Sequence, residues 1–173
     1  MRFLSLSPVH RIFLARVLVI TQFAILFGLG VIGTHNISKP KHDYLAAEVG
    51  SVIIGFLVIA AAGYSLRPSL RISPIPKANS PLIESGIYHR VRHPMYLAVI
   101  LIGFGMAGFS DSGLAWILEA LLIVDLNIKA RFEDELLLEA HPEAIHYQMH
   151  VSRILPCMGG SCKTSCLVDP TKD

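Results

Sequence analysis

Two short stretches of the sequence carry the side chains that could do chemistry. Residues 86–96 read G-I-Y-H-R-V-R-H-P-M-Y and hold two tyrosines, two histidines and two arginines. Residues 129–134 read K-A-R-F-E-D and hold two cations followed by two carboxylates. Together they bring basic, aromatic and acidic side chains into two short segments.

Pro94 predicts that a helix begins inside the first stretch. Proline suits the first helical turn, because its missing N–H has no intrahelical partner there and its φ is already helical. The apolar run 97–109 follows without a linker. We therefore expect the first stretch at the mouth of a membrane-embedded helix. A site there can take a polar cofactor from water and an oily substrate from the bilayer.

The composition favours a membrane protein. The chain has 173 residues, about the size of one domain. It is 53% hydrophobic and 16% charged, with a mean hydropathy of +0.55, whereas soluble domains contain about 25% charged residues. The net charge of +2 is small, and no basic stripe with interleaved aromatics is present, so nucleic acid is not an expected partner.

Two uncharged runs, residues 17–33 and 49–66, predict membrane-spanning helices. A helix as long as the first run rises about 26 Å, close to the thickness of the hydrocarbon core. A cleaved signal peptide is the alternative, but its apolar region would be shorter and no small-x-small cleavage site closes the run. We expect Gly50, Gly55 and Gly63 to let a neighbouring helix approach closely.

A further pair of apolar segments, Pro94–Ser110 and 113–124, predicts a helical hairpin with a tight turn at residues 111–113. Each segment is short for a full crossing, and Glu119 and Asp125 interrupt the second. Ionisable groups at membrane depth normally face a protein interior or cavity. A hydrogen-bonded or protonated core group is the alternative interpretation of Glu119.

From residue 127 onward the pattern becomes charged and amphipathic, which predicts a C-terminal helix on the cytoplasmic side. A tight hairpin brings its two ends together, so the polar stretches 86–96 and 129–134 are expected to meet. The sequence thus predicts an all-α integral-membrane bundle with about four hydrophobic segments. Its expected parts are a transmembrane pair (1–66), a core with the hairpin (67–156) and a tail (157–173).

Positive charge predicts the orientation. Residues 1–11 are positive, and residues 67–92 form the most basic segment, with four prolines that forbid a long regular helix. Positive segments stay cytoplasmic, and two spans separate these two. We therefore expect both termini and the meeting place of the polar stretches on the cytoplasmic side.

All three cysteines lie in the tail, at Cys157, Cys162 and Cys166. An odd number of cysteines argues against a disulfide framework. Their C-x4-C-x3-C spacing lacks the paired C-x2-C that is typical of zinc sites, so no metal site is predicted. The tail is interpreted as a mobile end without a catalytic role.

The chain resembles a family of membrane methyltransferases related to isoprenylcysteine carboxyl methyltransferase and phosphatidylethanolamine N-methyltransferase. The matching residues read L-I-E-S-G-I-Y-H-R-V-R-H-P-M-Y, then E-D-E-L-L, then H-Y-x-x-H-V-S-R-I-L-P. The resemblance covers residues 79–156, and the N-terminal spans match only in character. It implies S-adenosylmethionine as the methyl donor. It also implies a lipid-like or prenylated acceptor that reaches the site laterally from the bilayer.

The resemblance also implies roles for single residues. The positions that would bind the cofactor are Leu82, Ile83, Tyr88, Arg92, His93, Pro94, Tyr96, Glu133 and Asp134. Lys129 stands where the carboxyl methyltransferases place a substrate-contacting arginine, and it is a candidate catalytic residue together with Arg131. Lysine cannot make the planar, bidentate contact of arginine with a carboxylate, so this departure puts the acceptor in doubt.

The chemistry of the cofactor agrees with these positions. It carries a sulfonium cation, an amino group and a carboxylate, so its site needs groups of both charges. Methyl transfer is an in-line displacement that is helped by alignment and by removal of water from the nucleophile. Carboxylate O-methylation and amine N-methylation both stay open. The alternative class is a non-catalytic membrane bundle, or a metal-handling protein that uses the Cys and His residues.

Overall fold

The computed structural model describes residues 7–36, 44–66, 85–110 and 112–156. Every regular element in these ranges is a helix, so the predicted all-α class is confirmed. The elements are α1 (Pro8–Asn36), α2 (Leu45–Leu66), the short 3-10 helix η2 (Gly86–His89), α3 (Pro94–Ser110), α4 (Gly113–Ala140) and α5 (Ala144–His150).

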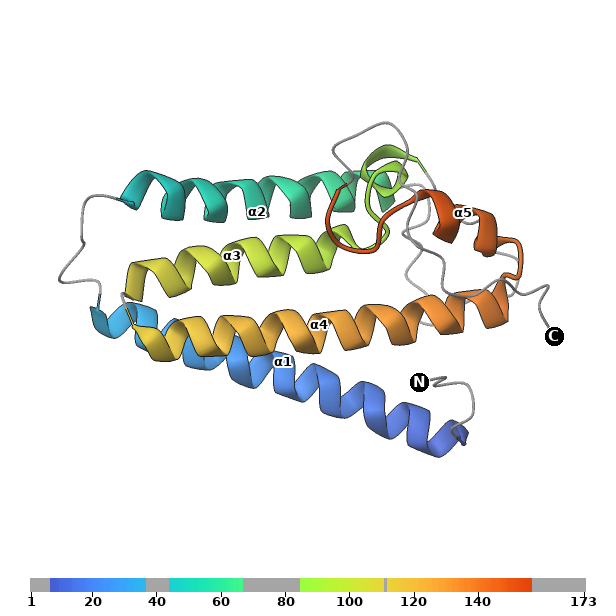
Figure 1. Ribbon diagram of the computed structural model, residues 1–173, viewed down its shortest axis with the longest axis horizontal. Coiled ribbons are helices and arrows are strands. Elements are labelled where there is room, and N and C mark those ends of the chain that lie inside the picture. The colour runs from blue at the N-terminus through green and yellow to red at the C-terminus, as the bar shows by residue number, and fades with distance from the viewer. Residues whose placement is uncertain (1–6, 37–43, 67–84, 111, 157–173) are drawn as a thin grey trace.

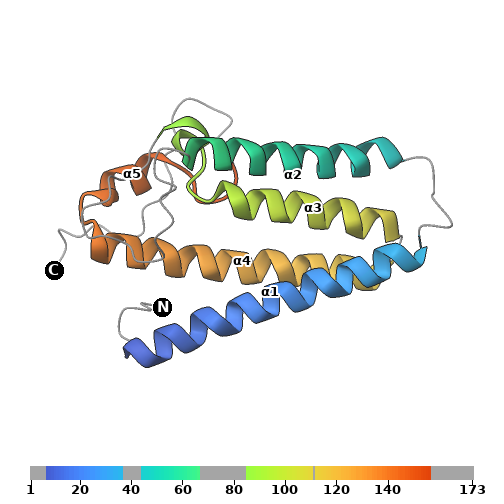
Figure 2. The ribbon, with the colours of Figure 1, turned by 180° about the vertical axis from the view of Figure 1, so that it is seen from behind.

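The four long helices lie side by side along the length of the molecule (Figures 1 and 2). α3 packs against α1, α2 and α4, and α1 also packs on α4. α3 and α4 run in opposite directions, as the hairpin prediction requires. The start of α3, the end of α4, η2 and α5 share one end of the bundle (Figure 1), which we call the polar end.

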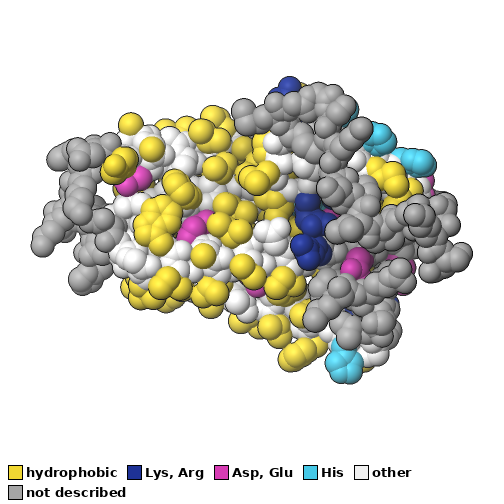
Figure 3. Space-filling model, viewed as in Figure 1, with side chains coloured by type: hydrophobic (Ala, Val, Ile, Leu, Met, Phe, Trp, Pro, Cys, Tyr) yellow, Lys and Arg dark blue, Asp and Glu magenta, His cyan; other side chains and the backbone are white. Residues whose placement is uncertain are grey.

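α1 and α2 each contain a segment long and apolar enough to cross a membrane, Val9–Thr34 and Leu45–Leu66. These segments contain the two runs from which spans were predicted. Large apolar side chains such as Phe27 and Leu57 point outward and are 75% and 63% exposed. Figure 3 shows hydrophobic side chains spread over the described part of that face away from the polar end, with a few acidic side chains among them. α3 is shorter, with 17 residues.

α4 is one continuous helix of 28 residues, which corrects the predicted boundary after residue 124. Glu119 and Asp125 do not interrupt it, because both face the interior and are only 2% and 6% exposed. The helix contains no proline, and no glycine after its first residue, so no residue in it breaks the hydrogen-bond ladder. Its length of about 42 Å carries residues 129–134 to the polar end.

The three glycines of α2 differ in how closely a neighbouring helix approaches them. A Cβ added at Gly55 would lie 2.9 Å from the backbone oxygen of Ala98 in α3, so only glycine allows this approach. The same test finds no atom of the described residues within 4 Å of a Cβ added at Gly50 or Gly63. The predicted role in close packing is therefore confirmed for Gly55 and wrong for the other two.

Candidate functional site at the polar end

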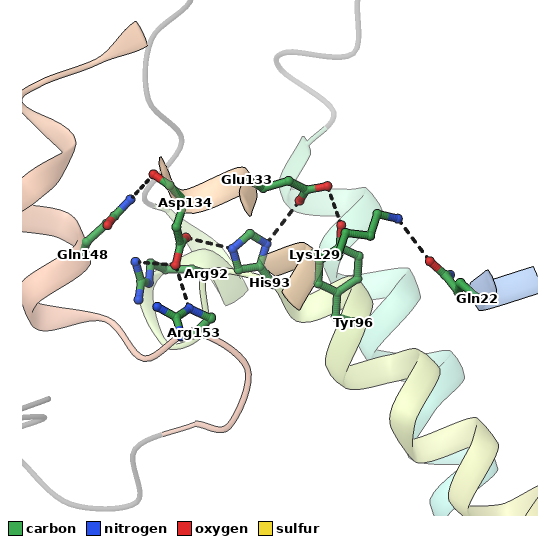
Figure 4. Close-up of polar contacts among 9 residues, drawn as sticks. All are labelled: Gln22, Arg92, His93, Tyr96, Lys129, Glu133, Asp134, Gln148 and Arg153. Carbon is green, nitrogen blue, oxygen red and sulfur yellow. Dashed lines mark hydrogen bonds and ion pairs between the residues drawn. The ribbon is translucent and has the colours of Figure 1, made fainter. Parts of the chain in front are cut away.

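The two polar stretches meet, as the hairpin predicts (Figure 4). His93 Nε2 lies 2.9 Å from Asp134 Oδ1, and the hydroxyl of Tyr96 donates to Glu133 Oε1 at 2.5 Å. His93 Nδ1 is also 3.6 Å from Glu133 Oε2. The contacts form because the first turn of α3 lies against the last turns of the antiparallel α4.

The start of α3 positions His93 and Tyr96. α3 begins at Pro94, as predicted, and Pro94 itself is buried. The His93 carbonyl accepts the N–H of Tyr96 at 3.1 Å, which forms the first turn. The two rings are stacked, with centroids 5.3 Å apart and planes 6° from parallel. Each ring therefore restricts the other beside Glu133.

The segment after α5 holds the start of α3 from the other side. The N–H of Arg92 donates to the oxygen of Ser152, and the N–H of His93 donates to that of Arg153, each at 2.9 Å. An isolated parallel bridge joins Val91 to Ser152. The backbone at the base of the site is thus tied to a segment about sixty residues away.

Asp134 is a buried carboxylate with three basic partners. It accepts from His93 Nε2, accepts from Arg153 Nε at 2.8 Å, and pairs with Arg92 Nη1 at 3.1 Å. Burial alone raises the pKa of Asp134, but the hydrogen bond from His93, the charge of Arg92 and the hydrogen bond from Arg153 outweigh it. The pKa is therefore held below the ordinary value. Asp134 and Arg92 serve first to join α4, α3 and the 151–156 segment.

Glu133 and Lys129 form the more open part of the site, on either side of Tyr96. The Glu133 side chain is 43% exposed. Lys129 Nζ lies 5.1 Å from the centroid of the Tyr96 ring and donates to Gln22 Oε1 of α1 at 3.1 Å. A carboxylate can accept about four hydrogen bonds and an ammonium donates three. Both groups can therefore bind a ligand in addition to these contacts.

Of the other predicted site residues, Arg131 does not join this cluster. Arg131 is exposed, and no described hydrogen bond or ion pair links it to the cluster. Two residues along an α-helix turn the side chain by about 200°, so Arg131 lies on the face opposite Lys129 and Glu133. Leu82 and Ile83 lie outside the described residues.

Tyr88 takes part in the contacts of the polar end through its backbone carbonyl rather than through its phenol. Its carbonyl accepts a hydrogen bond of 2.7 Å from the hydroxyl of Tyr147 in α5. The phenol is half-buried, which raises its pKa. None of the described polar contacts links that phenol to Glu133 or His93. In this structure Tyr88 helps to attach α5 to η2.

The sequence reasoning did not find two amides that join the cluster. Gln148 of α5 donates to the backbone oxygen of Asp134 at 2.9 Å. Gln22 binds Lys129 and is 9% exposed. A signal for Gln22 was present, because it is a hydrogen-bonding amide inside the uncharged run 17–33, where polar side chains bind neighbouring helices. No comparable signal marks Gln148.

Glu119 lies deeper in the bundle, against Gly103 of α3, where an added Cβ would collide with its carboxyl group. Neither carboxyl oxygen has a hydrogen-bond partner among the residues that the structure describes. The hydrogen-bonded interpretation of Glu119 is therefore not supported there. An ionised carboxylate so buried would be very unfavourable, which favours the neutral, protonated acid.

Figure 3 shows where the charged groups lie on one face of the molecule. Lys and Arg side chains gather at the border between the hydrophobic surface and the polar end. A ligand with one charged and one apolar part would meet both environments at this border.

No protein-family model matches this chain, and no curated protein and no solved structure matches it.

Proposed function

We propose that the chain is an integral-membrane methyltransferase that transfers a methyl group from S-adenosylmethionine to a lipid-like acceptor. The observation that carries this proposal is the contact of the R-H-P-M-Y stretch with the Glu133–Asp134 pair, through His93 and Tyr96. The resemblance of these stretches to membrane methyltransferases supplies the reaction class. The contacts supply one place where both stretches can act on the same ligand.

The side chains fit the charges of the cofactor. Glu133, which is 43% exposed, would accept its ammonium group. Arg92 supplies positive charge at the neighbouring Asp134, with which it pairs at 3.1 Å. The stacked rings of His93 and Tyr96 offer an aromatic surface next to Glu133. The cofactor, when bound, supplies an electrophilic methyl group, and the protein contributes orientation and electrostatics.

Lys129 would lie on the acceptor side of this site. Its ammonium is beside Tyr96 and can bind an anionic or hydrogen-bonding headgroup. α1, which binds it through Gln22, carries outward-facing apolar side chains that suit lipid. An acceptor could thus keep its hydrocarbon part in the bilayer while its head reaches Lys129.

In this proposal α1, α2, α3 and the first half of α4 lie in the bilayer. The polar end and both termini are cytoplasmic. The positive charge of residues 1–11 and 67–92 supports this orientation. Arg11 also contributes, because it forms an ion pair of 2.8 Å with Glu139 near the end of α4. That pair brings the start of α1 to the polar end.

Binding of S-adenosylhomocysteine to the purified protein in detergent tests the proposal. We expect Glu133→Gln to weaken binding by about ten- to a hundredfold, because a hydrogen bond to a charged group contributes about 1.5–3 kcal/mol. Glu139→Gln is the matched control on α4, and its affinity should equal that of the wild type. Absence of binding by the wild type, or equal binding by wild type, Glu133→Gln and His93→Ala, would remove the enzyme proposal.

The acceptor chemistry can be resolved with labelled cofactor. Phosphatidylethanolamine vesicles and an S-farnesylated N-acetylcysteine are suitable probes for the amine and carboxylate classes. A methyl ester is hydrolysed by alkali, whereas a methylated amine is not. Labelled product that survives alkali therefore excludes O-methylation.

A further inference from the structure

Gln22 is the polar side chain of α1 that faces the bundle interior within the span. It is 9% exposed, whereas its neighbour Thr21 is exposed on the outer surface of the helix. Its oxygen accepts an N–H of Lys129 at 3.1 Å, although the two residues are 107 positions apart. A buried amide in an apolar helix therefore meets one of the proposed site residues.

Lys129 has two carboxylates within reach on its own helix. Asp125 is four residues before it and Glu133 four residues after it, the spacing at which helical side chains of opposite charge pair. Lys129 nevertheless forms no ion pair with either among the described contacts. Its ammonium instead lies toward α1, bonded to Gln22 and beside the Tyr96 ring.

Loss of the Gln22 amide oxygen would change the partner of the Lys129 ammonium. A partly buried ammonium needs acceptors, and without Gln22 the carboxylates of Asp125 and Glu133, four residues away on either side, could supply them. Pairing with Glu133 would neutralise the group that the cofactor is proposed to meet. The position of Lys129 therefore decides whether Glu133 is available to a ligand.

We propose that Gln22 is a positioning residue: it holds the Lys129 ammonium on the α1 side of Tyr96 and so keeps Glu133 available. α1 then forms one wall of the site in addition to crossing the bilayer. This inference rests on the proposed function, because the ligand of Glu133 is taken to be the cofactor.

Binding of S-adenosylhomocysteine to four forms of the full chain tests the inference: wild type, Gln22→Met, Lys129→Met and the double variant. Gln22→Met should weaken binding about tenfold, the loss expected when a charged group captures Glu133. The double variant should return to the affinity of Lys129→Met, because no ammonium is left to capture the carboxylate. Unchanged binding in Gln22→Met, or a double variant weaker than Gln22→Met, would overturn the positioning role.

Two further variants separate positioning from general damage. Gln22→Glu keeps an acceptor oxygen at the same place and should bind with nearly wild-type affinity. Thr21→Val changes the adjacent, outward-facing residue and should have no effect on binding. Loss of binding in Thr21→Val would mean that any change in this turn of α1 disturbs the site, and would also contradict the inference.

Thermal unfolding tests the contact between Gln22 and Lys129 in the absence of any ligand. If the Gln22–Lys129 bond exists, the Tm loss of the double variant is smaller than the sum of the two single losses, which are expected to be about 2–4 °C each. Additive losses would refute the contact itself. If the Tm losses are non-additive but the wild type binds no cofactor, the proposed function and the positioning role are both refuted. Gln22 is then a packing contact.

Discussion

Asp134 is the side chain on which the polar end depends most. Its carboxylate and the Arg92 side chain are each 6% exposed, and His93 and Arg153 complete its contacts. A buried pair is not necessarily stabilising compared with apolar residues, but removal of one partner leaves the other charge uncompensated. The adjacent Glu133 is far more exposed and has fewer partners. Neighbouring acidic residues thus have different roles, one structural and one open to ligand.

Asp134→Asn is expected to lower the free energy of unfolding by about 3–5 kcal/mol, because the buried Arg92 would lose its ion pair with Asp134. Denaturation in detergent measures this loss. Glu139→Gln is the control, since its ion pair with Arg11 is at the surface, with Glu139 52% exposed, and such pairs contribute about 0–1 kcal/mol. Equal losses in the two variants would contradict the structural role of Asp134.

The same carboxylate predicts how stability depends on pH. The pKa of Asp134 is lower in the folded protein than its ordinary value of 3.8. Its contribution to stability is therefore complete above about pH 4 and is lost as the pH falls through the folded pKa. We expect the Tm of the wild type to fall below pH 4 and that of Asp134→Asn to fall less. Parallel curves for the two proteins would contradict this assignment.

At the scale of elements, α2 and α3 approach so closely that side chains are excluded at two points. A Cβ at Gly55 would meet the backbone of Ala98, and one at Gly105 would lie 2.8 Å from the backbone oxygen of Glu48. Backbone atoms cannot move aside as a flexible side chain can. This packing fixes α3, whose first turn carries His93 and Tyr96, against the rest of the bundle.

Gly55→Ala is therefore expected to destabilise the protein by about 1–3 kcal/mol, the range typical of overpacking. Gly50→Ala is the matched control on the same helix, because its Cβ would meet nothing within 4 Å. Alanine has the higher helix propensity, so Gly50→Ala should be neutral or slightly stabilising. The melting temperatures of the two variants test this prediction. A Gly55→Ala protein as stable as the wild type would refute the close approach of α2 and α3.

At the scale of the whole molecule, polarity is divided along the long axis. Large apolar side chains cover the outer faces of α1 and α2, and the charged cluster lies at the polar end. α4 runs from the opposite end, at Gly113, to the polar end, and α5 continues there (Figure 1). Such a division suits a protein whose polar end faces water while the rest is in lipid.

Single cysteines test this arrangement in sealed vesicles, after Cys157, Cys162 and Cys166 are replaced by serine. Gly113→Cys, where an added Cβ meets no described atom within 4 Å, lies at the start of α4, and His150→Cys, which is exposed, lies at the end of α5, at the opposite end of the molecule. A membrane-impermeant thiol reagent should label them from opposite sides of the bilayer. In the proposed orientation, His150→Cys reacts from the cytoplasmic side. Labelling of both from one side would exclude the transmembrane arrangement of α4.

The sequence by itself determined the features that depend on local properties of the chain. Long uncharged runs predict apolar helices because length and composition suffice, and Pro94 marks a helix start because its ring constrains φ. The meeting of the two polar stretches also followed, since a short turn between antiparallel helices leaves little freedom in where their ends lie. These predictions used residues close in sequence or joined by a tight connection.

Tertiary structure alone decided which side chains of each stretch meet and how they share their partners. It placed Lys129 and not Arg131 beside Tyr96, and it committed Asp134 to three basic groups. It also brought Gln22 to the site from more than a hundred residues away. Such contacts depend on how α1 is rotated and inclined against α4. Because α1 is apolar on most of its faces, its sequence leaves that rotation undetermined, and the amide of Gln22 indicates a contact but not its partner.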